Sequence, residues 1–127
     1  MLLEDFVKSA KKQDSRNLFA TSEEVEVLKD KDQLFKRFYQ DYNPQDVEID
    51  LKEEGVIRFF NLEQLLAVQK EYKSDDYFIF ATKNGDPIAI KEGGIYLTLH
   101  GQGDYNFKKV AESFKDYLQG LLVKIRS

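Results

Sequence analysis

The sequence predicts an α+β protein in two layers, with an antiparallel sheet of about five strands packed by N-terminal helices and a long C-terminal helix. Apolar residues recur at helical spacing near both ends of the chain. They alternate with acids over residues 46–51, as in a strand with one wet face. Between residues 77 and 99, two glycine-containing turns separate three short hydrophobic runs. The 127 residues suit a single domain, 1–127.

Three helices are expected in the N-terminal third. The first is a short amphipathic helix whose apolar residues lie over 2–10. The second starts from about Ser22, in "TSEEVEVL", which contains a capping box. The third carries apolar residues over 34–42 and ends before Asn43-Pro44, because proline disfavours the helical conformation in the residue that precedes it.

The middle of the chain alternates strands with one more helix. Residues 46–51 and "VIRFF" read as two strands joined by "KEEG". Asn61 is expected to cap a helix that follows. Its apolar side consists of Leu62, Leu65, Leu66 and Tyr72.

The last part of the chain reads as a β-meander and a final helix. Asn84-Gly85 suits a tight turn that needs positive φ, and Gly93-Gly94 is expected to serve the next turn. Alternation along "YFIFAT" puts Tyr77, Ile79 and Ala81 on one face of that strand, opposite Phe78 and Phe80. Apolar residues from 107 to 125 follow one helical face for five turns.

Composition excludes several classes of protein. The formal net charge is −4, which argues against direct binding of nucleic acid, since that needs a basic face. There is no cysteine, so no disulfide and no cysteine metal site is expected. The N-terminus lacks the pattern of a secretory signal, and no apolar run is long enough to span a membrane. We therefore expect a cytoplasmic protein, monomeric or weakly dimeric, that does not bind membranes.

No catalytic constellation is apparent. His100 is the single histidine and reads as an ordinary loop residue, and the glycines of "GQGDYN" do not complete a phosphate-binding motif. The pairs Asp75-Asp76 and Glu53-Glu54 read as solvated turns. Ser113 reads as a capping or surface hydroxyl of a helix. We expect no metal, no cofactor and no enzymatic activity. An enzyme would need a pocket that joins His100 to an acid from elsewhere in the fold.

The strongest candidate for a functional surface is the run of acids around the predicted strand 46–51. Its members are Asp46, Glu48 and Asp50, with Glu53 and Glu54 beside them. Two interpretations stay open. The acids can form a solvated face that protects an edge strand from aggregation. Alternatively, they can form a docking surface for a basic protein. Several negative charges on one surface then raise the rate of association with that protein and select it as the partner.

The order of the motifs resembles that of the SUKH superfamily. The chain contains "VIRFFNLEQL", "YFIFATKNGDPIAI", "IYLTLHG" and "VAESFKDYLQGLL" in succession, and the resemblance covers residues 21–122. Gly85, Asp86 and Pro87 match the family's "G-D-P" turn. Ser113 and Phe114 match the signature of its closing helix. By resemblance, these five residues are structural and not catalytic.

The resemblance implies a protein-binding domain. The superfamily contains fungal cell-wall assembly regulators and many small bacterial immunity proteins, which neutralise toxin domains, often nucleases, by occluding them. A basic toxin domain is thus the expected partner, with the five acids as contacts and Phe59 or Tyr77 as an aromatic anchor. The alternative is an intracellular regulatory or scaffold module, whose partner need not be basic.

Overall fold

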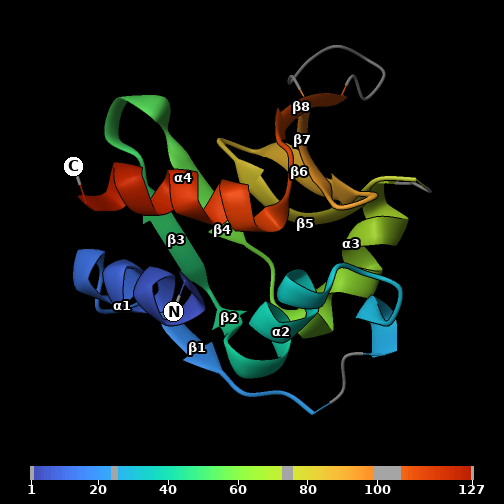
Figure 1. Ribbon diagram of the computed structural model, residues 1–127, viewed down its shortest axis with the longest axis horizontal. Coiled ribbons are helices and arrows are strands. Elements are labelled where there is room, and N and C mark those ends of the chain that lie inside the picture. The colour runs from blue at the N-terminus through green and yellow to red at the C-terminus, as the bar shows by residue number, and fades with distance from the viewer. Residues whose placement is uncertain (1, 24–25, 73–75, 99–106, 127) are drawn as a thin grey trace.

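The computed structural model describes residues 2–23, 26–72, 76–98 and 107–126. Six strands form one antiparallel sheet in the order β3-β4-β5-β6-β7-β8, so that each strand pairs with the next one along the chain (Figure 1). The strands are β3 (Val47–Asp50), β4 (Val56–Phe59), β5 (Phe78–Lys83), β6 (Asp86–Lys91), β7 (Gly94–Thr98) and β8 (Phe107–Ala111). The predicted α+β class is confirmed, with a sheet one strand larger than expected.

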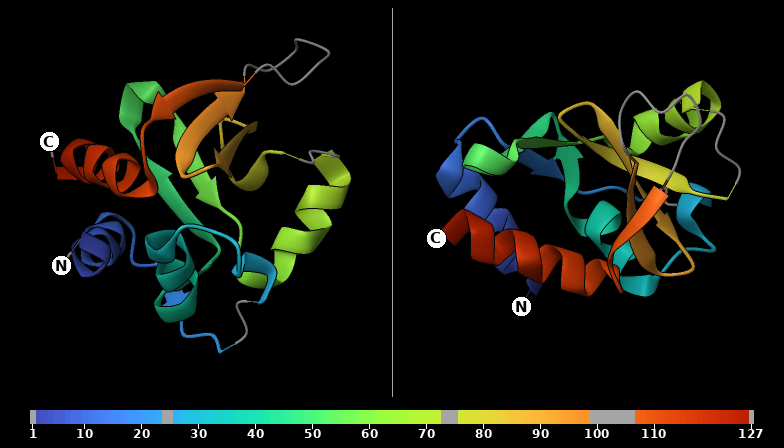
Figure 2. Two further views of the ribbon diagram at one scale, coloured as in Figure 1. Left: turned by 45° about the vertical axis from the view of Figure 1, so that its right-hand side comes forward. Right: turned by 90° about the horizontal axis from the view of Figure 1, so that it is seen from above.

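Helices cover both faces of this sheet. The helices α1 (Leu2–Gln13), α2 (Gln33–Asp41) and α4 (Phe114–Arg126) pack their apolar residues into the main core on one face. On the other face, α3 (Leu65–Tyr72) covers a small second cluster of Val68, Ile79 and Ala89 (Figure 2). Asn61 caps the 3₁₀ turn Leu62–Gln64 that leads into α3, as predicted. Leu66 is 60% exposed, so the expected apolar side of this helix is wrong at that position.

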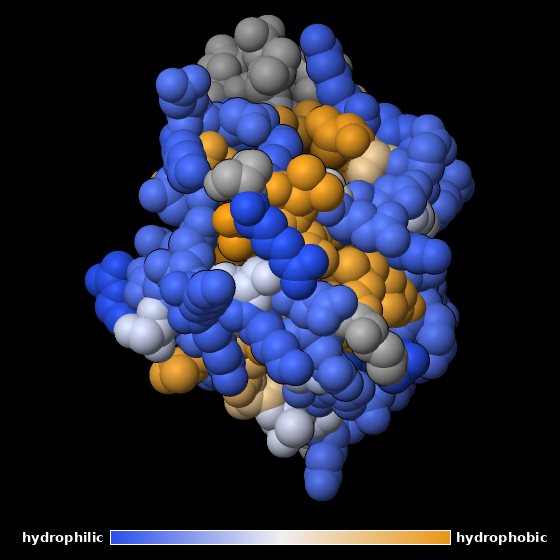
Figure 3. Space-filling view, turned by 60° about the vertical axis from the view of Figure 1, so that its left-hand side comes forward, coloured by the Kyte–Doolittle hydropathy of each residue, from blue (hydrophilic) through white to orange (hydrophobic). Residues whose placement is uncertain are grey.

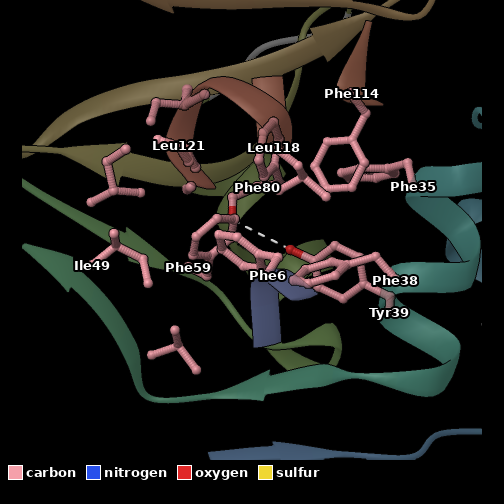
Figure 4. Close-up of a cluster of buried hydrophobic side chains, with 14 of the residues drawn as sticks. Phe6, Phe35, Phe38, Tyr39, Ile49, Phe59, Phe80, Phe114, Leu118 and Leu121 are labelled. Atoms are coloured by element: carbon pink, nitrogen blue, oxygen red, sulfur yellow. Dashed lines mark hydrogen bonds between the residues drawn. The ribbon is translucent and has the colours of Figure 1, made fainter. Parts of the chain in front are cut away.

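The main core is built on aromatic rings. Phe35 and Phe38 from α2 contact Phe114 of α4, with ring centroids 5.0 and 5.5 Å apart, and Phe80 of β5 lies against Phe35 at 5.2 Å (Figure 4). The buried Tyr39 hydroxyl shares its one proton between the carbonyls of Phe60, at 3.0 Å, and Phe80, at 3.4 Å. The core therefore fixes α2 and α4 to the middle of the sheet.

The segment around Ser22 differs from prediction. Its described part contains only a 3₁₀ turn at Glu26–Leu28, and Glu24 of the expected capping box lies outside the described residues. Asp32 accepts hydrogen bonds at the start of α2 only four residues after that turn, which leaves no length for a further helix. A short pair of strands, β1 (Leu18–Ala20) and β2 (Asn43–Gln45), was not predicted.

The predicted C-terminal helix is wrong in its first part, where Phe107–Ala111 form β8 and α4 begins only at Phe114. A β-bulge explains the misleading spacing. Ile95 pairs with Ala111 and Tyr96 with Lys109, which leaves Val110 as an extra residue. The bulge interrupts alternation, so the apolar residues 107, 110 and 111 imitate helical spacing.

Two details of the meander also differ from prediction. A bulge at Phe80 places Ala81 in the main core beside Phe80, and not on the face of Ile79. In the turn between β6 and β7, the residues with positive φ are Glu92 and Gly93, because Gly94 already belongs to β7.

Candidate binding surface

The five acids meet at the β3 edge of the sheet and at the turn after it. Val47 and Ile49 are fully buried in the main core, so Glu48 and Asp50 point to the opposite face and are exposed. Asp46 lies at the bend before β3, and Glu53 and Glu54 lie in the 3₁₀ turn Lys52–Glu54. We call Asp46, Glu48, Asp50, Glu53 and Glu54 the acidic strip.

Two amide side chains close the outer edge of β3. Asn17 Nδ2 donates to the Glu48 carbonyl at 2.9 Å, and the Glu48 N–H donates to Asn17 Oδ1 at 3.0 Å. Gln13 makes the same pair of bonds with Asp50, at 2.8 and 2.9 Å. The backbone groups that an edge strand normally leaves open are therefore paired. The carboxylates of β3 are left as its outward-facing polar groups.

Basic residues neutralise part of the acidic strip. Arg58, opposite Glu48 on β4, makes a 2.7 Å ion pair with Asp46 and lies 4.0 Å from Glu48. Lys124 of α4 contacts Glu54 at 2.9 Å. The side chains of these pairs are 43 to 78% exposed, so water competes for each contact and its contribution to stability is small.

The two aromatic candidates lie in different environments. Phe59 is 2% exposed and contacts Phe6 and Phe38 in the main core, so the expectation that it anchors a partner is wrong. Tyr77 is half-buried and stacks on Phe107 at 4.1 Å between ring centroids. The ammonium group of Lys91 lies 4.7 Å from the Tyr77 ring centroid. Tyr77 packs on the α3 side of the sheet, the side to which Glu48 and Asp50 point.

The residues of the family's motifs have structural roles. Asn84 and Gly85 adopt positive φ in the turn that precedes Asp86 and Pro87 of β6. The Asn84 side chain accepts a hydrogen bond from the Val56 N–H at 3.0 Å. A side chain at Gly55, whose φ is +108°, would collide with Asn84, so Gly55 permits this contact.

Ser113 and Phe114, the matched residues of the closing helix, also have structural roles. The Ser113 hydroxyl accepts a hydrogen bond from the Asp116 N–H at 3.0 Å, as a helix-capping residue does. Phe114 is fully buried among the aromatic rings of the main core. Ser113 therefore caps the start of α4, and Phe114 belongs to the main core.

Chemistry-bearing candidates are few in the part of the chain that the structure describes. His100, Gly101, Gly103 and Asp75 lie outside it. Within the described ranges, no three metal-binding side chains come together. The helices of those ranges include none that is long and apolar enough to cross a membrane.

Removal of the Asn17 amide is expected to destabilise the protein. Asn17 is 1% exposed and also donates to the Ala10 carbonyl at 3.0 Å. Asn17→Ala should lower the free energy of unfolding by about 2–3 kcal/mol, because partly buried backbone groups lose the side chain to which they are hydrogen-bonded. Gln13→Ala is the matched control, and since Gln13 is exposed its loss should stay below about 1 kcal/mol. Urea unfolding measures both, and equal losses would contradict a buried role for Asn17.

The ion pair with Lys124 predicts a pH effect at Glu54. Its hydrogen bond and charge hold the pKa of Glu54 below the ordinary value. Because the folded-state pKa is the lower one, the contact stabilises the protein above the unfolded-state pKa and is lost as pH falls through the folded-state pKa. In Lys124→Met, the pKa of Glu54 should rise toward 4.5 in a carboxyl NMR titration. An unchanged pKa would show that the contact is not made in solution.

Comparison with known proteins gives the family. The sequence model of the SMI1 / KNR4 family (SUKH-1) matches residues 32–120, which is most of the chain. No curated protein matches the sequence. The match spans α2, the whole six-stranded sheet and the first half of α4. The chain belongs to the SMI1 / KNR4 family (SUKH-1), within the SUKH superfamily.

Proposed function

We propose that this protein is a non-catalytic immunity protein that binds a basic toxin domain through the acidic strip and occludes the toxin's substrate surface. Family membership is consistent with an immunity-like or a regulatory protein-binding domain. The acidic strip is the feature that favours an immunity-like role over a regulatory one. Its carboxylates suit a nuclease, which carries a basic groove for the phosphates of its substrate. We expect it to act in the cytoplasm, where such a substrate lies.

The observation that carries this proposal is the closed edge of β3. Charged residues on an edge strand often serve only to prevent pairing with another sheet. Here Gln13 and Asn17 already occupy the open backbone groups of Glu48 and Asp50. The carboxylates are therefore not needed for that protection, and the docking interpretation gains weight over the solvated edge.

The geometry of the strip suggests how the partner is bound. Arg58 holds Asp46 and approaches Glu48 in the free protein. An arginine or lysine of the toxin can take over these carboxylates while Arg58 moves into solvent. Glu53, in the exposed turn Lys52–Glu54, adds a further carboxylate to this negative surface. Tyr77, on the same side of the sheet, is the candidate aromatic anchor at the edge of such an interface.

Charge reversal tests the strip. The double variant Glu48→Lys/Asp50→Lys should slow association with the toxin domain encoded beside this protein by at least about tenfold at low salt, because electrostatic steering is lost. The difference should shrink at moderate salt. Glu4→Lys/Glu71→Lys is the matched control. Both residues are exposed, on α1 and α3, and the two substitutions change the net charge by the same amount as those of the strip variant. Stopped-flow kinetics and titration calorimetry measure the effect.

Three results would oppose the proposal in different ways. Equal slowing in both double variants would show that net charge matters and the strip does not. Tight binding of the toxin domain by the wild type without salt dependence would show that the interface is not electrostatic and would remove the acidic strip from it. An absence of binding to a folded toxin domain would remove the immunity function itself.

A further inference from the structure

A pocket of about 560 Å³ lies between α1, the last turn of α4 and the turn that follows β3. Four cationic side chains line it, namely Lys8 and Lys12 of α1, Lys52 of the turn and Arg126 of α4. We call it the basic pocket, because no carboxylate of the described residues lines it. Figure 3 views the side on which α1 and α4 lie together and shows hydrophilic side chains around a seam of apolar surface. In a protein of net charge −4, such a concentration of positive charge needs a local explanation.

The two cations from α1 have no acidic partner. Lys8 and Lys12 are exposed and lie four residues apart, so they share one side of the helix. None of the ion pairs within the described part of the chain involves either ammonium group. Like charges at this spacing weaken a helix. The pair therefore costs α1 stability, and nothing in the described structure compensates this cost.

A hydrogen bond between the two helices orients the guanidinium group of Arg126. Its Nε donates to the Ser9 hydroxyl of α1 at 3.3 Å. The terminal N–H groups of Arg126 have no partner among the residues that the structure describes. Paired N–H groups of an arginine match the oxygens of a phosphate or a carboxylate. Arg126 is therefore placed to receive an oxyanion beside the two lysines of α1.

Stabilisation of helix ends does not account for all four cations. The C-terminal end of a helix carries partial negative charge, which a cation in the last turn offsets. Lys12 and Arg126 lie in the last turns of α1 and α4. Lys8 lies one turn earlier in α1, and Lys52 belongs to neither helix. Because each helix end carries only about half an elementary charge, the pocket stays positive.

The lining of the basic pocket indicates the class of anion. Four positive charges around one concavity favour a compact anion with several charges over a single carboxylate. The volume is that of a small-molecule site, and the half-buried Ile125 supplies an apolar contact. No aromatic ring of the described residues lines the pocket, so the bases of a nucleic acid would have none to stack on. None of the large apolar side chains that are exposed in the described ranges lines it either, so no such group is available to enter a bilayer.

We propose that the basic pocket binds a soluble small molecule that carries a diphosphate group. Arg126 holds one phosphate in a bidentate contact, and the three lysines of the pocket neutralise the remaining oxygens. Ile125 meets the organic group to which the diphosphate is attached. This site goes beyond the proposed immunity function and uses none of the residues of the acidic strip.

Titration calorimetry of the full chain with sodium pyrophosphate at low salt tests the pocket. The wild type should bind pyrophosphate with a Kd below about 100 μM, and orthophosphate at least about tenfold more weakly, because the smaller anion reaches fewer cations. Lys8→Gln/Lys12→Gln should weaken pyrophosphate binding by at least about tenfold. Lys70→Gln/Lys115→Gln is the matched control, since both lysines are exposed, do not line the pocket and remove the same charge. It should leave the Kd within about twofold of wild type.

Arg126→Lys separates a shaped site from general attraction between charges. It keeps the charge and removes the bidentate contact, so the Kd should rise by at least about fivefold. The melting temperature of Lys8→Gln/Lys12→Gln should not fall, because repulsion between the two lysines is relieved, so its weaker binding is not explained by unfolding. Amide NMR of the wild type should show shifts at Ser9 and Ile125 as pyrophosphate is added.

Three outcomes would overturn the site. The first is an absence of pyrophosphate binding by the folded wild type. The second is equal weakening in both lysine double variants, which would show that the anion responds only to net charge. The third is an unchanged Kd in Arg126→Lys, which would remove the bidentate contact. Because none of these measurements uses the toxin domain, their failure would leave the proposed immunity function untouched.

Discussion

The closure of the β3 edge by Gln13 and Asn17 is the constraint on which the binding surface depends. Four hydrogen bonds tie the end of α1 and the residues after it to the backbone of Glu48 and Asp50. They satisfy groups that would otherwise attract another strand. They also hold β3 so that its apolar residues face the core and its carboxylates face solvent. Gln69 pairs in the same bidentate way with Ile79, next to the bulge in β5, so the fold uses amide side chains where its sheet leaves backbone groups unpaired.

The two bulges of the sheet have related consequences. The bulge in β5 lets Phe80 and Ala81 both enter the main core while Ile79 serves the smaller cluster under α3. The bulge in β8 makes Val110 an extra residue that is 48% exposed. The aromatic core fixes α4 through the buried Phe114 and Leu118, while Gly120, farther along the same helix, is exposed.

Periodic patterns predicted the elements whose side chains alternate regularly. The acids at 46, 48 and 50 predicted β3, and Asn84-Gly85 predicted the turn between β5 and β6. The strand β8 was mistaken for a helix because its bulge disturbs alternation. Of the proposed contacts, Phe59 proved to be buried, since a strand's sequence does not tell which face meets helices from distant parts of the chain. The roles of Gln13 and Asn17 depend on hydrogen bonds to residues 37 and 31 positions away and left no local pattern in the sequence.

The strand β3 is a closed edge that presents its carboxylates, and not its backbone, to a partner. Amide hydrogen exchange of Glu48 and Asp50 in the free protein, followed by NMR, tests this claim most directly. The account predicts that both amides exchange as slowly as those of the inner strands β4 and β5, because Asn17 and Gln13 accept their hydrogen bonds. Exchange at the rate of an unprotected peptide would mean that the edge is open and that the acids of β3 serve to protect it.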